Sequence, residues 1–177
     1  AVAWVRDNIA AYGGDPRRIV LAGHSAGAYN AVMLGLDTRY LEAAGVDPRT
    51  IRAVAGLSGP YDFLPFDQDT TRKVFGQAPD KAATQPVTFA GPDAPPAFLA
   101  SGADDTIVRP RNTKSLAERL RAARVPVQER IYPGLDHADT LLALSVTFRT
   151  KAPELAEMAA FLKGQTTNRR QATIGRR

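Results

Sequence analysis

Apolar residues recur along the chain in two patterns, one with the spacing of a helix and one with the continuous run of a buried strand. Spacings of three to four residues predict helices over residues 2–12, 26–36, 114–124 and 155–162. Short, nearly all-apolar runs predict strands over residues 18–22, 51–57 and 96–100, and residues 127–132 give a fourth predicted strand. Strands that are apolar on both faces are buried on both faces. The pattern therefore predicts an α/β fold with a mostly parallel sheet and helices on both faces.

Residues 60–95 interrupt this alternation of strands and helices. The segment is rich in Pro, Asp and Gln, and only residues 71–75 within it have a weak helical pattern. We expect one α/β domain over residues 1–163, with residues 60–95 forming an excursion over the edge of the sheet. Such loops often carry binding residues, because a rigid scaffold holds them in place.

The charge of the chain is concentrated at its C-terminal end. The net charge is +5, and residues 163–177 contain five basic and no acidic side chains, so the rest of the chain sums to zero. This distribution argues against a nucleic-acid-binding protein and predicts a disordered basic tail at residues 164–177. No apolar run approaches the roughly 18 residues of a membrane span.

The residue types that are missing narrow the chemistry further. The chain has no cysteine, which excludes disulfides, thiol catalysis and cysteine zinc ligands. No group of residues predicts a metal site or an organic cofactor. No signal-peptide pattern opens the chain. The location is not predicted, and the cytoplasm is only the default, because we expect the true N-terminus to be missing. The oligomeric state is not predicted.

Residues 23–27 read Gly-His-Ser-Ala-Gly, a Gly-x-Ser-x-Gly motif between a predicted strand and a predicted helix. Such a tight turn exposes the serine hydroxyl in a strained conformation, and side chains at both glycine positions would collide. Ser25 is the candidate nucleophile, and the backbone N–H of Ala26 is a candidate donor to developing negative charge. An ordinary serine in a turn is the alternative. A phosphate-binding loop would require a Gly-Lys-Ser/Thr ending, which is missing.

A nucleophilic serine needs a base, and the chain contains only two histidines. His24 is the immediate neighbour of Ser25 and would project away from it at a sharp turn. We expect it to pack or to form a hydrogen bond beside the end of the strand. His137 follows the predicted strand 127–132, and loops after parallel strands share one edge of the sheet with the serine turn. His137 is therefore the candidate base.

An imidazole base works best beside a carboxylate that fixes its tautomer. Asp104 and Asp105 both follow the predicted strand 96–100, and only one of them can point into the site. The chain order serine, acid, histidine is the order found in α/β-hydrolases. The residues alone do not choose between the two carboxylates.

Four motifs resemble those of bacterial α/β-hydrolase esterases. They are Gly-His-Ser-Ala-Gly-Ala at 23–28, Leu-Ser-Gly-Pro-Tyr-Asp at 57–62, Gly-x-x-Asp-x-x-Val at 102–108 and Tyr-Pro-Gly-x-x-His at 132–137. The likeness is strongest to the carboxylesterase, feruloyl-esterase-like and kynurenine-formamidase-like group, and it covers residues 1–163. The resemblance implies an α/β-hydrolase fold, a small-molecule ester substrate and no cofactor.

The resemblance also assigns the acid and identifies a departure from the family pattern. The family places its acid three residues after the glycine, which is Asp105 here. It also carries a His-Gly-Gly oxyanion segment on an earlier strand, and this chain begins after that point. We therefore expect an α/β-hydrolase fold that lacks its N-terminal strands. We also expect the isolated chain to be impaired, since one lost oxyanion donor costs about 100- to 1,000-fold in rate.

The expected activity is hydrolysis of carboxylic esters through an acyl-enzyme on Ser25. Fold and triad do not choose the substrate, so the alternatives among enzymes are an amide or formamide hydrolase and a small peptidase with the same triad. The alternative from another class is a non-catalytic binding protein. Tyr61, Phe63 and Phe66 are candidate wall residues for the acyl or alcohol group. Plain core packing is the alternative for all three.

Overall fold

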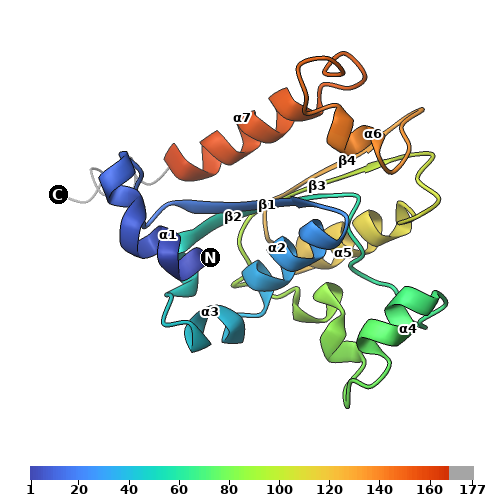
Figure 1. The fold of residues 1–177 in the computed structure, drawn as a ribbon, viewed down its shortest axis with the longest axis horizontal. Helices are drawn as coiled ribbons and strands as arrows, with labels where there is room; N and C mark the ends of the chain where they lie inside the picture. The colour runs from blue at the N-terminus through green and yellow to red at the C-terminus, as the bar shows by residue number, and fades with distance from the viewer. Residues whose placement is uncertain (168–177) are drawn as a thin grey trace.

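Four parallel strands lie at the centre of the structure, in the order β1-β2-β3-β4 (Figure 1). The computed structural model describes residues 1–167. The strands are β1 (Ile19–His24), β2 (Ile51–Leu57), β3 (Ala97–Gly102) and β4 (Val127–Tyr132). All three neighbouring pairs are parallel. The segments that follow the four strands therefore open at one edge of the sheet, where ligands bind in sheets of this kind.

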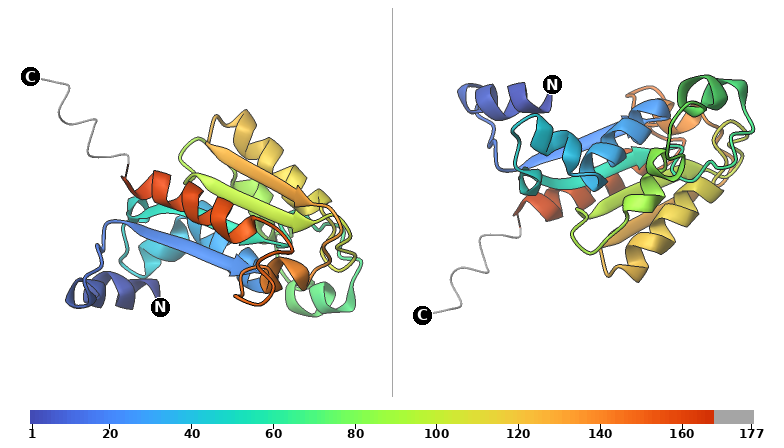
Figure 2. Two further views of the ribbon diagram at one scale, coloured as in Figure 1. Left: turned by 90° about the horizontal axis from the view of Figure 1, so that it is seen from above. Right: turned by 90° about the horizontal axis from the view of Figure 1, so that it is seen from below.

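Helices cover both faces of the sheet, as the sequence predicts. Helices α2 (Ala26–Leu36) and α5 (Arg111–Ala122) lie on one face, and α7 (Glu154–Thr167) lies on the other (Figures 1 and 2). The shorter helices are α1 (Val2–Asn8), α3 (Arg39–Ala43), α4 (Asp69–Phe75) and α6 (Asp139–Leu142). Turns of 3-10 helix occur at Ile9–Tyr12, Pro48–Thr50, Ala82–Thr84 and Pro86–Phe89.

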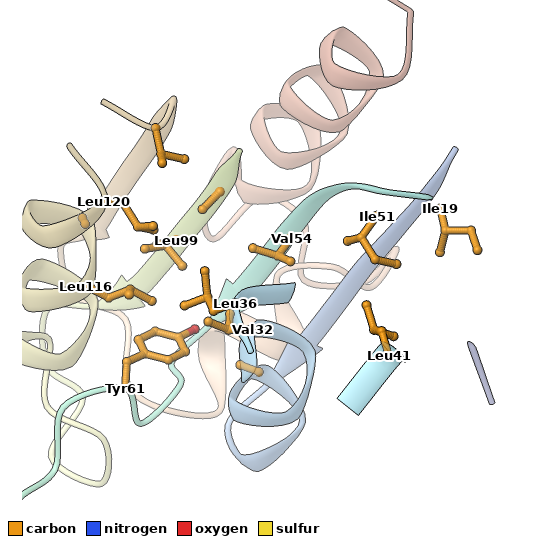
Figure 3. Close-up of a cluster of buried hydrophobic side chains, with 14 of the residues drawn as sticks. Ile19, Val32, Leu36, Leu41, Ile51, Val54, Tyr61, Leu99, Leu116 and Leu120 are labelled. Atoms are coloured by element: carbon orange, nitrogen blue, oxygen red, sulfur yellow. The ribbon is translucent and has the colours of Figure 1, made fainter. Parts of the chain in front are cut away.

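The two faces of the sheet have separate apolar cores, which explains why the central strands are apolar throughout. Leu99 of β3 packs in the cluster with Val32, Leu36, Leu116 and Leu120 from α2 and α5 (Figure 3). The next residues on either side along β3, Phe98 and Ala100, point the other way and pack in the α7 cluster. Alternation along a strand thus buries every residue of β3.

Three predicted helices have different boundaries in the structure. The helix predicted over residues 114–124 runs from Arg111 to Ala122. The predicted helix 2–12 divides into α1 and a 3-10 turn, which ends at Gly13 with a φ of 83°. The last helix continues to Thr167, so the predicted boundary of the tail at residue 164 is wrong. The hydroxyl groups of Thr166 and Thr167 donate to the Leu162 and Lys163 carbonyls one turn earlier. The rest of the predicted tail, residues 168–177, lies outside the described part of the chain.

The segment 60–95 lies near the carboxyl ends of the strands and contains α4 (Figures 1 and 2). Buried side-chain amides hold its beginning. The Asn112 side-chain oxygen accepts hydrogen bonds from the N–H groups of Tyr61 and Asp62, at 3.0 and 2.9 Å. The Gln85 side-chain oxygen accepts one from Phe63 at 2.7 Å. These bonds position the segment beside the sheet edge. Among residues 1–167, no helix is both long and apolar enough to cross a membrane.

Candidate active site

Ser25 lies in the turn between β1 and α2, and its backbone adopts a conformation that few non-glycine residues adopt. Its φ is 55° and its ψ is −123°. The Ser25 N–H donates to the Leu57 carbonyl at 2.9 Å, and the Ser25 carbonyl accepts from the Tyr29 N–H at 3.1 Å. The strand on one side and the helix on the other therefore hold a backbone strain of about 1–3 kcal/mol. This arrangement exposes the hydroxyl at the edge of the sheet.

The two glycines beside Ser25 have different roles. A Cβ at Gly23 would overlap the carbonyl of Gly27 and lie 2.7 Å from the backbone nitrogen of Ala28. A Cβ at Gly27 would meet nothing within 4 Å. The prediction that a side chain would collide at both positions is therefore wrong for Gly27, which faces open space. Only Gly23 is required by the close approach of strand and helix.

The structure brings the three predicted catalytic residues into one hydrogen-bonded chain. The His137 Nε2 atom lies 2.9 Å from the Ser25 hydroxyl oxygen, and its Nδ1 atom lies 2.8 Å from Asp105 Oδ2. A carboxylate only accepts hydrogen bonds, so Nδ1 carries the proton, and a neutral ring leaves Nε2 free to accept the serine proton. The geometry suits transfer of a proton from Ser25 to His137.

Asp105, and not Asp104, faces the histidine. Asp105 is 3% exposed, and its second oxygen accepts hydrogen bonds from the N–H groups of Ile107 and Val108, at 3.0 and 2.8 Å. These bonds fix the carboxylate plane that meets His137. Asp104 is exposed, and its backbone N–H donates to the Leu135 carbonyl at 3.0 Å. The geometry thus agrees with the choice that the family resemblance implied.

A cavity of about 610 Å³ opens beside Ser25. Residues from α2, from the segment 60–95 and from the loop after β3 surround it. Its apolar wall consists of Tyr29, Pro60, Phe63, Val74, Phe75, Ile107 and Val108. Ala26 also lines the cavity as the first residue of α2, and its N–H is among those that a helix leaves without an intrahelical acceptor. The cavity is large enough for a small organic ligand.

Of the three predicted wall residues, only Phe63 lines the cavity. Tyr61 is fully buried and packs against Val32 and Gly56 in the core, so its proposed contact with substrate is corrected to core packing. Phe66 is not a lining residue. Its ring lies 5.9 Å from that of Phe63 and 6.1 Å from that of Phe75, which places it in the aromatic layer of the wall.

Several lining residues were not predicted. Tyr29 lies one helical turn after Ser25, a spacing that could have placed it on the same side of α2. Its hydroxyl donates to the Thr84 carbonyl at 3.0 Å, and burial raises the pKa of Tyr29 to about 12. Tyr29 therefore stays neutral at physiological pH. Phe75 falls in the weakly helical stretch of the excursion, whose path the sequence pattern does not determine.

Charged side chains also line the cavity. Asp67, Arg109 and Arg111 contribute to the lining. In the part of the chain that the structure describes, no group of three or more His, Asp or Glu side chains is placed to hold a metal ion.

Comparison with known proteins places this geometry in a family. Esterase LipQ of Mycobacterium tuberculosis is 29% identical over 98% of this chain and 45% of its own length. Isoprenylcysteine alpha-carbonyl methylesterase ICME of Arabidopsis thaliana is 29% identical over 80% of this chain and 38% of its own length. The chain thus spans less than half of the length of these relatives.

Solved structures share the fold. A carbohydrate esterase from gut microbiota, in a truncated form, superposes with a TM-score of 0.75 at 20% identity, covering 94% of this chain and 66% of its own. A carboxylesterase from Lactobacillus plantarum superposes with a TM-score of 0.73 at 19% identity, with the same coverage. The family model described as BD-FAE matches residues 1–120, more than half of the chain. The chain therefore belongs to the BD-FAE family and has the α/β-hydrolase fold.

Proposed function

We propose that the protein to which this chain belongs is a serine hydrolase that cleaves carboxylic esters through an acyl-enzyme. The observation that carries the proposal is the chain Ser25–His137–Asp105, with separations of 2.9 and 2.8 Å, beside a cavity of about 610 Å³. The names of two relatives, an esterase and a methylesterase, point to the same bond type. A phosphate-binding loop does not need a histidine and a carboxylate at the serine hydroxyl.

Acylation begins when the Ser25 oxygen attacks the ester carbonyl carbon and His137 Nε2 takes the hydroxyl proton. Asp105 holds the imidazole in the required tautomer and stabilises the imidazolium that forms. The tetrahedral intermediate then expels the alcohol, which receives the proton from His137. The acyl group remains on Ser25 as an ester.

Deacylation repeats these steps with water in place of the serine. His137 Nε2 removes a proton from water, whose oxygen attacks the acyl carbon. The second tetrahedral intermediate then releases the carboxylic acid, and His137 returns the proton to the Ser25 oxygen. Negative charge develops on the former carbonyl oxygen in both halves of the reaction. The Ala26 N–H is the donor we assign to that oxygen, because it starts α2 next to the nucleophile.

The cavity wall suggests the kind of group that the site accepts. Aromatic and aliphatic side chains form most of the wall, with Phe63 and Phe75 at a ring separation of 5.5 Å. Burial of an apolar group there is favourable by about 25 cal/mol for each Å² removed from water. A small-molecule ester with an apolar acyl or alcohol group fits this wall.

The test compares Ser25→Ala with a matched control, Ser145→Ala. Ser145 is exposed and its hydroxyl only donates to the Leu142 carbonyl, so the control leaves the site intact. We expect Ser25→Ala to lower kcat/KM on p-nitrophenyl acetate and butyrate by at least about 1,000-fold, with unchanged circular dichroism. A fluorophosphonate probe should label the wild type and the control but not Ser25→Ala. Retained turnover or labelling in Ser25→Ala would reject the proposal.

A further inference from the structure

The backbone carbonyl of His137 is held by two side chains that lie outside the triad. His24 Nε2 lies 2.7 Å from this oxygen, and the Thr140 hydroxyl lies 3.1 Å from it. His137 is located in a loop between β4 and α6, and the side-chain bonds of the triad fix only its imidazole. The contacts at the carbonyl fix the backbone from which that imidazole projects.

The chemistry of the acceptor determines the direction of each bond. A carbonyl oxygen only accepts, so His24 Nε2 carries a proton and donates it. The Thr140 hydroxyl likewise donates to the His137 carbonyl, and its oxygen then accepts from the Ser58 hydroxyl at 3.0 Å. Ser58 and Thr140 are both fully buried. The two donors to the carbonyl therefore come from different elements, β1 and α6.

His24 also contacts the ring of the base. The centroids of the His24 and His137 rings are 4.8 Å apart, at an angle of 50°. This separation is within the range of favourable contact between aromatic rings. His24 is the last residue of β1 and the immediate neighbour of Ser25. One strand end thus meets His137 at two points, through the Ser25 hydroxyl at its side chain and through His24 at its backbone.

We infer that His24 is a positioning residue that sets the place of the His137 imidazole relative to the Ser25 hydroxyl by donating its Nε2–H to the His137 carbonyl. The inference rests on the proposed function, since it concerns the base of that reaction. The hydrogen bonds of the Ser25 hydroxyl and of the imidazole nitrogens, among residues 1–167, go to one another and to Asp105, so His24 acts through His137. A shift of about 1 Å in a reacting group costs on the order of 100-fold in rate.

Three substitutions at His24 separate positioning from general packing. Gln places an amide nitrogen the same number of bonds from Cα as Nε2, whereas Asn places it one bond closer. Met has the length of Gln without a donor. We expect His24→Gln to keep kcat within about threefold of the wild type. We expect His24→Met and His24→Asn to lower kcat by roughly 10- to 100-fold with little change in KM.

The pattern across the three variants decides the inference. Equal loss of kcat in the Gln and Met variants overturns it, and so does an effect confined to KM. The number of folded sites in each variant is counted by labelling Ser25 with a fluorophosphonate to completion, so that kcat is expressed per intact site. If Met prevents folding, the comparison of Gln with Asn still tests the position of the donor.

Nuclear magnetic resonance tests the hydrogen bond without reference to activity. The chain of residues 1–177 contains two histidines, so selective ¹⁵N-histidine labelling of this chain yields two rings to assign. Long-range ¹H–¹⁵N correlation at neutral pH should show His24 protonated on Nε2 and His137 protonated on Nδ1. A His24 ring protonated on Nδ1 alone overturns the inference. If the whole protein to which this chain belongs has no esterase activity while the chain shows the expected tautomers, the proposed function is contradicted and the His24 bond is established.

Discussion

The turn that carries Ser25 and the loop that carries His137 are built in different ways. Backbone packing builds the turn, because Gly23 passes against Gly27 and the Ser25 N–H bonds to the neighbouring strand β2. Side-chain hydrogen bonds build the loop, because Asp105 holds the imidazole and His24 holds the backbone carbonyl. The nucleophile depends on steric fit within a few residues. The base depends on groups that are distant in the chain.

Because the Ser25 turn and the His137 loop are built differently, they should tolerate different substitutions. Backbone packing fails when an atom is added at the point of contact, whereas a hydrogen-bonded loop fails when a donor or an acceptor is removed. Variants that add one methyl group should therefore affect the Ser25 turn, and variants that replace a carboxylate with an amide should affect the His137 loop. The following predictions are ordered by the size of their expected effect.

The largest loss of activity is expected from Asp105→Asn, which changes a hydrogen bond that holds the His137 loop. The amide that replaces the carboxylate favours the wrong imidazole tautomer and cannot stabilise the imidazolium. Loss of this interaction costs about 10⁴-fold in kcat in a serine protease triad. We expect a loss of this order in ester hydrolysis, measured as kcat.

Asp104→Asn is the matched control for this prediction, because its side chain is exposed and its contact to Leu135 uses only the backbone. It should stay within about twofold of the wild type. Comparable losses in the two variants would contradict the assignment of the acid.

The next largest loss of activity is expected from Gly23→Ala, which disturbs the backbone packing of the Ser25 turn. The added methyl group would overlap the Gly27 carbonyl and must push the strand away from α2. Ser25 would move with the strand, so we expect a loss of about 100-fold or more in kcat/KM and a lower Tm. The measurements are ester turnover and thermal unfolding.

Gly27→Ala adds the same methyl group where nothing lies within 4 Å. We expect its kcat/KM to stay within about threefold of wild type and its unfolding free energy to stay the same or rise by up to about 1 kcal/mol, since Ala has a higher helix propensity than Gly. If the two glycine variants behaved alike, steric fit at Gly23 would not be what builds the turn.

The smallest effect on activity is expected from Glu154→Gln, at the first residue of α7. Glu154 is fully buried, and neither of its carboxyl oxygens has a hydrogen-bond partner among residues 1–167. Burial raises the pKa of Glu154 to about 8 from its ordinary 4.5, and the nearby Glu157 carboxylate contributes. Between these two values the folded protein keeps a proton that the unfolded chain loses. Stability should therefore fall as the pH rises from about 5 to 8.

Glu154→Gln removes this titration, so the free energy of unfolding should vary less with pH over that interval. Urea unfolding at several pH values measures it, and kcat at neutral pH should change by less than about twofold. Glu118→Gln, at an exposed position on α5, is the control and should keep the pH dependence of the wild type. If Glu154→Gln has the same pH dependence as the wild type, the Glu154 carboxyl does not have different pKa values in the folded and unfolded protein.

The same difference explains what the sequence could predict. The predicted bounds are confirmed for one helix and two strands, at residues 26–36, 51–57 and 127–132. The order of apolar and polar residues along each of these segments is a local signal. Ser25 and His137 were predicted from a glycine motif and from the position after a strand. Both clues lie within a few residues of the side chain concerned.

What could not be predicted depends on tertiary contacts. Tyr61 was expected at the substrate wall, yet Gly56 and Gly59 leave room for its ring in the core. The role of Thr140 beside His137 depends on Ser58, which is 82 residues away in the chain. The α4 side of the cavity depends on how residues 60–95 fold over the sheet edge. No periodicity along the chain encodes these distances.

The order of strands in the sheet sets a required length for the loop after β4. Three strand spacings, about 14 Å, separate β4 from β1, and the five residues from Pro133 to His137 reach at most about 17 Å when extended. On the way the loop passes over β3, where the Asp104 N–H bonds to the Leu135 carbonyl. The loop and the His137 side chain together therefore span this distance. A one-residue deletion would displace the imidazole from the Ser25 hydroxyl, so the number of residues here is as constrained as their identity.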